Sequence, residues 1–113
     1  MTKRDLYWLA GLLEGEGCFG FTRNHVKGHI YAYPQIQLRM CDHDVVNRAA
    51  ALMGCTIQSY PGSRATQKRF WQFSLTCRRA AAMMQQLEPL MGTRRSAKIR
   101  SILKRGPHAV HKG

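Results

Sequence analysis

The sequence predicts an α+β domain, in which antiparallel strands carry helices on one face and leave the other face polar. Paired short segments alternate apolar and polar side chains, which is the period of half-buried strands. The segments between them have helical spacing and end at capping or breaking residues. The chain has 113 residues, of which 44% are hydrophobic, enough to bury one modest core.

The first half of the chain predicts one helix and two strands. The helix is expected over about residues 6–15, with Asp5 as its N-cap and Gly17 just beyond its end. Residues 18–24 alternate and predict a strand, and a polar loop around residues 27–28 follows. The second strand has two faces: Ile36, Leu38 and Met40 on one, and Gln35, Gln37 and Arg39 on the other.

The second half repeats this order and adds two helices. Asp42 is the expected N-cap of a helix that Gly54 ends. The later elements are a strand over 56–60, a turn at Pro61-Gly62, a strand over 70–75, a helix over 79–88 up to Pro89, and a basic helix over 94–105. Residues 106–113 have almost nothing to bury, so we expect a domain over 1–105 and a surface tail over 106–113.

The charge of the chain indicates a polyanionic partner. Lysine and arginine total 18 against six aspartates and glutamates, which gives a formal net charge of +12 and makes nucleic acid the default partner. A membrane surface is the alternative, but no apolar run approaches the roughly 18 residues of a spanning helix. The first residues lead into glycines and glutamates rather than an apolar signal core. We therefore expect a soluble intracellular protein, in a bacterial or phage-infected cytoplasm because arginine outnumbers lysine.

The cysteines do not indicate a metal centre. They are widely scattered, at Cys18, Cys41, Cys55 and Cys77. No pair has the short separation of a zinc knuckle, and no histidine pair follows at ligand spacing. Free, partly buried thiols are favoured over a zinc site.

The predicted first helix has two faces. One face is apolar and fits against the sheet, and the other contains Trp8, Gly11, Leu12 and Gly15. Two glycines in a helix cost about 1 kcal/mol each relative to alanine, and the usual gain is the close approach of another backbone. In a one-domain chain the simplest partner is the same helix of a second copy, so these residues are the predicted dimer interface.

Two acidic residues end this helix. Glu14 and Glu16 are a third of all the acids in the chain, and a carboxylate at a helix C-terminus opposes the helix dipole by about 0.3–1 kcal/mol. Solvated surface acids that balance nearby arginines are the simpler explanation. The glycine pair and the surrounding positive charge favour a function instead, because carboxylate oxygens are the hard ligands that Mg²⁺ requires.

These residues resemble a known family. The segment Leu9-Ala10-Gly11-Leu12-Leu13-Glu14-Gly15-Glu16-Gly17 is similar to the nine-residue signature of the LAGLIDADG homing endonucleases, with both aspartates replaced by glutamate. The order of elements after the motif, and Leu87-Glu88-Pro89-Leu90 before a basic stretch, extend the resemblance over about residues 5–105. The resemblance implies an αββαββα fold whose four-stranded sheet forms a saddle on DNA, and a homodimer joined through the motif helices.

The resemblance also implies a metal site and a reaction. Glu16 matches the acid that binds divalent metal at the scissile phosphates, and the Gly15 carbonyl is the second protein ligand. The basic residue that assists catalysis maps to Arg94, with Arg95 and Lys98 as alternatives. Mg²⁺ or Mn²⁺ is the expected cofactor, with Ca²⁺ supporting binding without cleavage, and the expected products carry short 3′ overhangs. The chain departs from the family at Met40-Cys41, where members often carry a polar residue that positions water.

Polar strand residues are the candidates for contact with double-stranded DNA that has a long, roughly palindromic target. Those expected at base edges are Thr22, Asn24, Gln35, Gln37, Arg39, Gln72 and Ser74. Those expected at phosphates are Arg23, Lys68, Arg69 and the 94–105 helix with Arg95 and Arg100. Any one of them could instead be an ordinary solvated residue.

Two other functions remain open at this point. The first is a catalytically silent DNA-binding regulator or RNA maturase on the same scaffold, although such a protein has no need of a carboxylate that faces phosphates. The second is a ribosome- or RNA-associated basic protein, which fits the charge but leaves the two-glycine helix and its paired acids unexplained.

Overall fold

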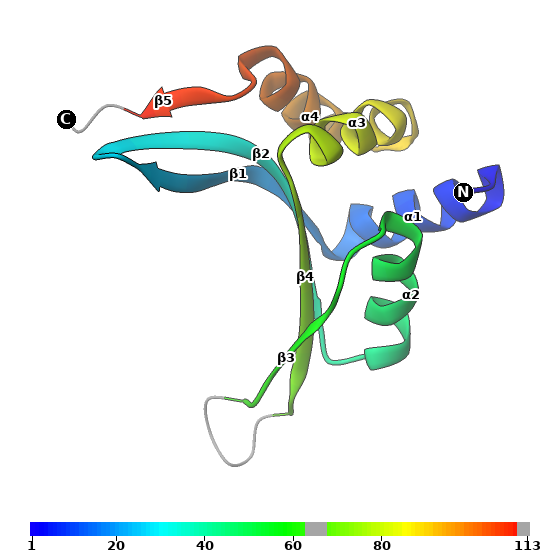
Figure 1. Ribbon diagram of the computed structural model, residues 1–113. Helices are drawn as coiled ribbons and strands as arrows, with labels where there is room; N and C mark the ends of the chain where they lie inside the picture. The colour runs from blue at the N-terminus through cyan, green and yellow to red at the C-terminus, as the bar shows by residue number, and fades with distance from the viewer. Residues whose placement is uncertain (63–67, 111–113) are drawn as a thin grey trace. The chain divides into compact units, whose positions relative to one another are not determined.

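The computed structural model describes residues 1–62 and 68–110, which form two compact units (Figure 1). Among the described residues, the first unit comprises 1–18, 37–62 and 68–75, and the second comprises 19–36 and 76–110. In chain order the elements are α1 (Lys3–Glu16), β1 (Gly17–Val26), β2 (His29–Met40), α2 (His43–Met53), β3 (Gln58–Tyr60), β4 (Phe70–Thr76), α3 (Cys77–Leu87), the 3₁₀ turn η1 (Glu88–Leu90), α4 (Thr93–Arg105) and β5 (His108–Val110). No helix in these described ranges is long and apolar enough to cross a membrane.

The strands are joined in the hydrogen-bonding order β1-β2-β4-β3, and β5 also pairs with β2. The α+β class and the four predicted strands are confirmed, and β5 is an addition to them. Strand β3 runs antiparallel to β4 with Tyr60 opposite Phe70, and β5 runs antiparallel to β2 with His108 opposite Ala32.

Helix α1 begins earlier than predicted. Its N-cap is Thr2, whose side chain accepts a hydrogen bond from the Asp5 backbone N–H, while the Asp5 carboxylate accepts one from the Thr2 N–H, each at 3.1 Å. This reciprocal pair is a capping box, so the expectation that Asp5 is the N-cap was wrong. Asp5 lies three residues after the N-cap, where its carboxylate completes the capping box and interacts favourably with the positive N-terminal end of the helix dipole.

The β1–β2 hairpin turns at Lys27 and Gly28, as the sequence indicates. Both residues have positive φ, 49° and 80°, which is the pattern of a two-residue hairpin turn whose twist matches that of the flanking strands. The α2 boundaries are also confirmed: the Asp42 side chain accepts from the Val45 N–H, and Gly54 ends the helix in the left-handed region at φ 68°.

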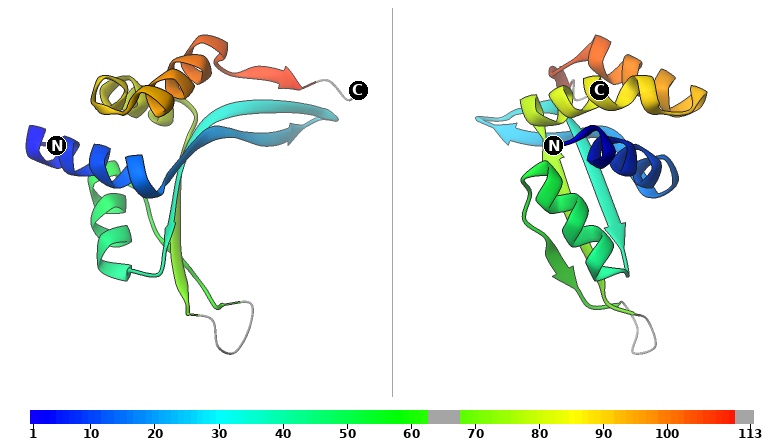
Figure 2. Two further views of the ribbon diagram at one scale, coloured as in Figure 1. Left: turned by 180° about the vertical axis from the view of Figure 1, so that it is seen from behind. Right: turned by 90° about the vertical axis from the view of Figure 1, so that its right-hand side faces the viewer.

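Each unit has an apolar core formed by the predicted alternation. In the first unit the buried side chains include Leu9, Leu13, Leu38, Val46 and Phe73, and α2 runs beside the β3–β4 hairpin in both views of Figure 2. In the second unit they include Phe19, Ile36, Met84, Leu87 and Ile99. The period of two therefore predicts correctly that Ile36 and Leu38 of β2 are buried, whereas Met40 on the same predicted face is half-buried.

The segment after α4 is not the extension that we expected. Gly106 ends α4, and residues 108–110 form β5 against β2, with the side chains of His108 and Val110 half-buried. The prediction failed because a three-residue strand has too little pattern of its own, and only pairing with a distant strand stabilises it. Residues 111–113 lie outside the described part of the chain.

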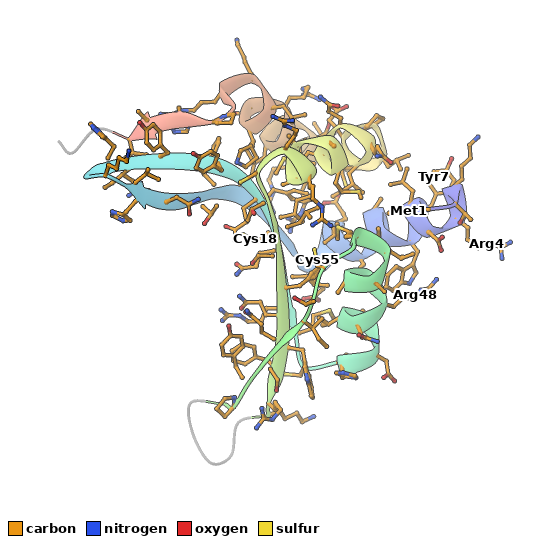
Figure 3. The ribbon with its side chains drawn as sticks, viewed as in Figure 1. Met1, Arg4, Tyr7, Cys18, Arg48 and Cys55 are labelled. Atoms are coloured by element: carbon orange, nitrogen blue, oxygen red, sulfur yellow. The ribbon has the colours of Figure 1, made fainter. Side chains whose placement is uncertain are left out.

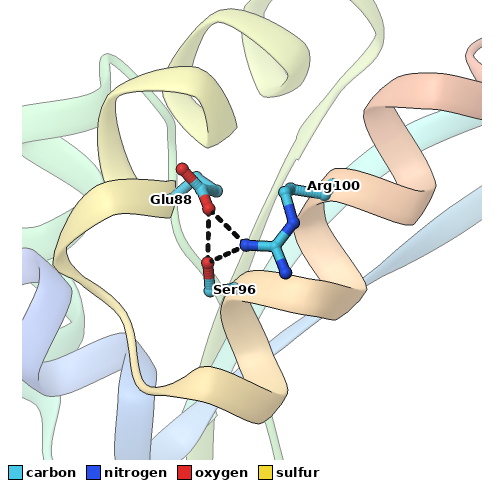
Figure 4. Close-up of polar contacts among 3 residues, drawn as sticks. All are labelled: Glu88, Ser96 and Arg100. Atoms are coloured by element: carbon cyan, nitrogen blue, oxygen red, sulfur yellow. Dashed lines mark hydrogen bonds and ion pairs between the residues drawn. The ribbon is translucent and has the colours of Figure 1, made fainter.

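A polar triad joins η1 to α4 in the second unit (Figure 4). The Glu88 carboxylate accepts hydrogen bonds from the Ser96 hydroxyl and from Arg100 Nη1, the latter at 2.8 Å, and Arg100 Nη1 also donates to Ser96 Oγ at 2.8 Å. The hydrogen bonds from Ser96 and then from Arg100 lower the pKa of Glu88 below its ordinary value. Ser96 is buried, so this triad satisfies a hydroxyl that would otherwise be costly to bury.

The triad predicts an acid-dependent loss of stability. Because the folded pKa of Glu88 is lowered, its contribution is present above the unfolded pKa and is lost as the pH falls through the folded value. We expect Tm in wild type to exceed that of Glu88→Gln at neutral pH, and the difference to shrink on acidification. Thermal melts of both proteins at several pH values measure this. A Tm difference that stays constant from neutral to strongly acidic pH contradicts it.

Candidate nucleic-acid interface and active site

Glu16 and Gly15 lie together at the exposed C-terminal end of α1. The helix ends there because Gly17, whose N–H still bonds the Leu13 carbonyl, has extended backbone angles (φ −78°, ψ 159°) and begins β1. Glycine fits this buried position because a Cβ would lie 2.8 Å from both Leu13 O and Leu13 Cδ2. Glu14, two residues before Glu16, is half-buried.

The donor set at this end suits a hard divalent cation. A carboxylate and a main-chain carbonyl near a helix C-terminus both offer oxygen, and the last carbonyls of a helix have no donor within it. Across residues 1–62 and 68–110, no group of three or more His, Cys, Asp or Glu residues forms a metal-binding cluster. Glu16 and the Gly15 carbonyl would hold a cation together with oxygens from a bound phosphate.

The glycine face of α1 is open. Gly11 and Gly15 are exposed, and a Cβ at either would meet no atom within 4 Å. Trp8 differs from the other predicted interface residues because the guanidinium of Arg48 lies over its ring, 4.0 Å from the centroid. Arg48 is on α2 and is labelled in Figure 3. Leu12 is half-buried, and the neighbouring Tyr7 is 58% exposed. The predicted interface is thus accessible, and Arg48 and Tyr7 border it.

Arg39 is the most organised residue of the predicted base-reading set. Its Nε donates to Gln72 Oε1 at 3.1 Å, and its guanidinium lies 4.7 Å from the centroid of the Phe70 ring. Tyr60 stacks on the same ring, with centroids 5.1 Å apart and planes at 19°. These contacts line a hollow of about 730 Å³ formed by Arg39, Cys41, Tyr60, Pro61, Gly62, Lys68 and Phe70. A guanidinium held over an aromatic ring loses little rotamer freedom on binding.

Phe70 and Tyr60, which the structure places beside Arg39, were not singled out from the sequence. Alternation already places Phe70 on the face of Gln72 and Ser74, and the β3–β4 register adds Tyr60 to it. The sequence signal that could have identified them is the aromatic Phe70 on a strand face that is otherwise polar. The nearby Arg69, expected at phosphates, donates instead to Ser59 Oγ at 2.6 Å. Lys68 and Ser74 are exposed, and Gln37 is half-buried on the face opposite Leu38.

The β1–β2 part of the second unit presents a comparable polar face. Thr22 and Asn24 alternate with Phe21 and Arg23, so Arg23 lies on the Phe21 side rather than with them. Gln35 is half-buried and alternates with buried residues of β2. Two further residues share its face and were not predicted, Tyr31 and Tyr33.

The four basic residues of α4 that the sequence analysis singled out differ in their surroundings. Arg94 and Lys98 are exposed and, one turn apart, share a stripe of the helix. Arg95 is half-buried, with its guanidinium 5.9 Å from the Phe19 ring centroid. Arg100 is engaged with Glu88, although its side chain remains 60% exposed. Arg94 and Lys98 belong to the second unit, whereas Glu16 belongs to the first.

The antiparallel α+β fold of this chain is similar to that of LAGLIDADG homing endonucleases. Solved structures agree. The chain superposes on the homing endonuclease I-CvuI in complex with its target in the presence of Ca with a TM-score of 0.69 and 15% identity, over 91% of this chain and 68% of that one. For the group I intron-encoded homing endonuclease I-CeuI complexed with DNA the TM-score is 0.64 at 14% identity, over 91% and 55%. For the archaeal intron-encoded I-Vdi141I complexed with DNA it is 0.63 at 14% identity, over 89% and 67%.

The sequence comparison identifies the family. Residues 4–60, half of the chain, match the family described as the PI-PfuI endonuclease subdomain. The chain therefore belongs to this family of LAGLIDADG homing endonucleases. The fold that the nine-residue motif implied is confirmed.

Proposed function

We propose that the protein is a site-specific, divalent-metal-dependent endonuclease that acts on double-stranded DNA as a homodimer. The observation that carries this proposal is the exposed Glu16 carboxylate beside the Gly15 carbonyl, at the end of a helix whose glycine face is open. A purely structural helix gains nothing from two solvent-exposed glycines, or from an acid that opposes its dipole in a chain of net charge +12.

The chemistry follows from these groups. Glu16 and the Gly15 carbonyl would hold Mg²⁺ or Mn²⁺ through hard oxygen donors. The cation would supply a coordinated water of lowered pKa and neutralise charge on the phosphate, whereas Ca²⁺ would support binding alone. Arg94, with Lys98 on the same stripe of α4, is the proposed cation that stabilises the pentacoordinate phosphate, and Arg95 is an alternative.

The homodimer accounts for cleavage of both strands. Two copies joined through Trp8, Gly11, Leu12 and Gly15 would place one Glu16 on each side of a two-fold axis, opposite the two scissile phosphates. Such a dimer requires a long, roughly palindromic target and would leave short 3′ overhangs. Base edges would be read by Thr22, Asn24, Gln35, Gln37, Arg39, Gln72 and Ser74. Phosphates would be bound by Lys68, Arg69, Arg95 and Arg100.

A selection experiment tests this function. Duplexes that bind the protein in Ca²⁺ are recovered from a random library, amplified, and incubated with the protein in Mg²⁺. We expect double-strand cleavage in Mg²⁺ and none in EDTA, with end sequencing showing 3′ overhangs. Specific binding without cleavage in either Mg²⁺ or Mn²⁺ would contradict the proposal.

One observation favours the silent DNA-binding protein as the second candidate. The end of β2 carries Met40 and the exposed Cys41, and the adjacent Asp42 uses its carboxylate to accept from the Val45 N–H at 3.3 Å. Neither Met40 nor Cys41 offers the amide oxygen or carboxylate that would position a water here. Specific binding without cleavage in the selection experiment would identify this alternative.

Arg39 should determine specificity at one base pair of each half-site. Because Gln72 and Phe70 fix its guanidinium, Arg39→Ala removes a preorganised donor pair and should cost about 1–3 kcal/mol at that base pair. Arg100→Ala, the matched arginine on a helix, should weaken binding uniformly with a shallower salt slope, and should also lower stability because Glu88 loses its partner. Binding titrations on the selected target and on random duplex measure both. Equal losses on the two duplexes for Arg39→Ala would show that it contacts only the backbone.

A further inference from the structure

The second unit contains a hollow of about 410 Å³ that the proposed function does not use. Its lining comes from three strands and one helix: Phe21 and Arg23 of β1, Ala32 of β2, Arg105 of α4, and His108, Ala109 and Val110 of β5. We propose that this hollow binds a phosphate group, at a site separate from the polar strand face assigned to DNA.

The charge of the hollow indicates an anionic ligand. Arg23 and Arg105 both line it, no carboxylate does, and neither guanidinium has an ion pair or hydrogen bond within residues 1–62 and 68–110. Two like charges in one hollow repel each other, and an oxyanion between them removes that repulsion. A planar guanidinium offers paired donors that match the oxygens of a phosphate.

His108 adds an oriented imidazole to the same hollow. Its Nδ1 lies 2.9 Å from the Gly106 carbonyl oxygen, which can only accept, so Nδ1 carries the hydrogen. The ring meets Phe21 edge to face, with centroids 4.9 Å apart and planes at 81°. These two contacts fix the ring and leave Nε2 as the nitrogen available to a ligand.

The backbone that forms the hollow depends on one glycine. Gly106 has φ 61° and ψ −168°, a conformation essentially restricted to glycine, and its N–H bonds the Ile102 carbonyl at 2.9 Å. This residue ends α4 and redirects the chain so that β5 pairs with β2, where His108 lies opposite Ala32 (Figure 1). The turn therefore places Arg105 and His108 on either side of Gly106, around a single hollow.

The hollow and the predicted base-reading residues lie on opposite faces of β1. Side chains alternate along a strand, so Phe21 and Arg23 point away from the face of Thr22 and Asn24. A duplex bound on that polar face leaves the hollow accessible to a second phosphate, and Arg23 is assigned to the hollow rather than to the duplex. The volume exceeds that of a phosphate alone, so the ligand is a phosphorylated small molecule or a backbone phosphate of a nucleic-acid strand.

A titration of the full chain with inorganic phosphate tests this site. In phosphate-free buffer, NMR should show saturable shifts at Gly106 and His108. Arg23→Gln and Arg105→Gln should each weaken binding by about tenfold or more, because a charge-assisted donor pair is lost. The matched control is Lys104→Gln, which removes the same charge from the same helix turn but does not line the hollow. It should retain wild-type affinity.

Two further measurements identify the source of the phosphate group and test whether the hollow is independent of the DNA-binding face. A single-stranded octathymidine that displaces phosphate at Gly106 and His108 identifies a nucleic-acid strand, and displacement by ATP alone identifies a small phosphorylated molecule. Unsaturable shifts, or equal weakening by Lys104→Gln and Arg105→Gln, would overturn the phosphate site. A loss of duplex binding in Arg23→Gln and Arg105→Gln as large as in Arg39→Ala would overturn its separation from the DNA face. Arg105 is exposed, so its variant keeps the test interpretable if Arg23→Gln proves unstable.

Discussion

Glu16→Gln should abolish Mg²⁺-dependent cleavage while leaving specific DNA binding in Ca²⁺ within about twofold of wild type. The amide keeps the shape of the side chain but removes the charge that holds a divalent cation. Removing one group that stabilises the charge of a transition state typically lowers the rate by about 10²–10³-fold. Loss of the metal should lower it by at least as much. Single-turnover cleavage of the selected duplex measures the rate, and filter or gel binding in Ca²⁺ measures the affinity.

Glu14→Gln is the matched control for this substitution. It makes the same chemical change two residues away, on a side chain that is half-buried rather than exposed at the helix end. We expect it to alter stability or dimerisation more than the cleavage rate. Cleavage by Glu16→Gln at the wild-type rate would refute the assignment of the active site, and equal losses in the two variants would show that the effect is structural.

Gly11→Leu should convert a dimer into a monomer without unfolding the chain. Beyond its own stretch of helix, a Cβ at Gly11 would meet no atom of the described chain within 4 Å. Leucine has a helix propensity about 1 kcal/mol better than glycine, so the monomer should gain stability. At a helix–helix contact between two copies, the added side chain separates the backbones at an overpacking cost of about 1–3 kcal/mol. This weakens the dimer roughly 5- to 150-fold for each contact that is lost.

Sedimentation equilibrium over a range of concentrations measures this change, with Tm recorded on the same samples. Ala51→Leu, on the exposed side of α2, adds comparable apolar bulk outside the predicted interface and should leave the dimer intact. An unchanged dimer in Gly11→Leu, or a monomeric wild type at the concentrations at which it cuts DNA, would show that the glycine face of α1 is not the interface.

The site could be predicted from the sequence wherever its residues are neighbours in the chain. Gly15, Glu16 and Gly17 are consecutive, so the motif alone placed an exposed acid at a helix end. Asp42 and Gly54 bound α2 through local capping geometry, which depends only on a few adjacent residues. The wrong N-cap of α1 is instructive, because both Thr2 and Asp5 can cap and only their reciprocal hydrogen bonds show which one begins the helix.

The tertiary structure decided what depends on residues far apart in the chain. Arg39 meets Phe70 and Gln72, and Glu88 meets Arg100, only because strand pairing and helix packing bring these segments together. Strand β5 exists because β2 offers it an edge, and its register brings His108 to Phe21. Periodicity along a sequence gives the face on which a side chain lies. The residue that a side chain contacts across the sheet depends on strand register and packing. These are set only when the whole chain folds.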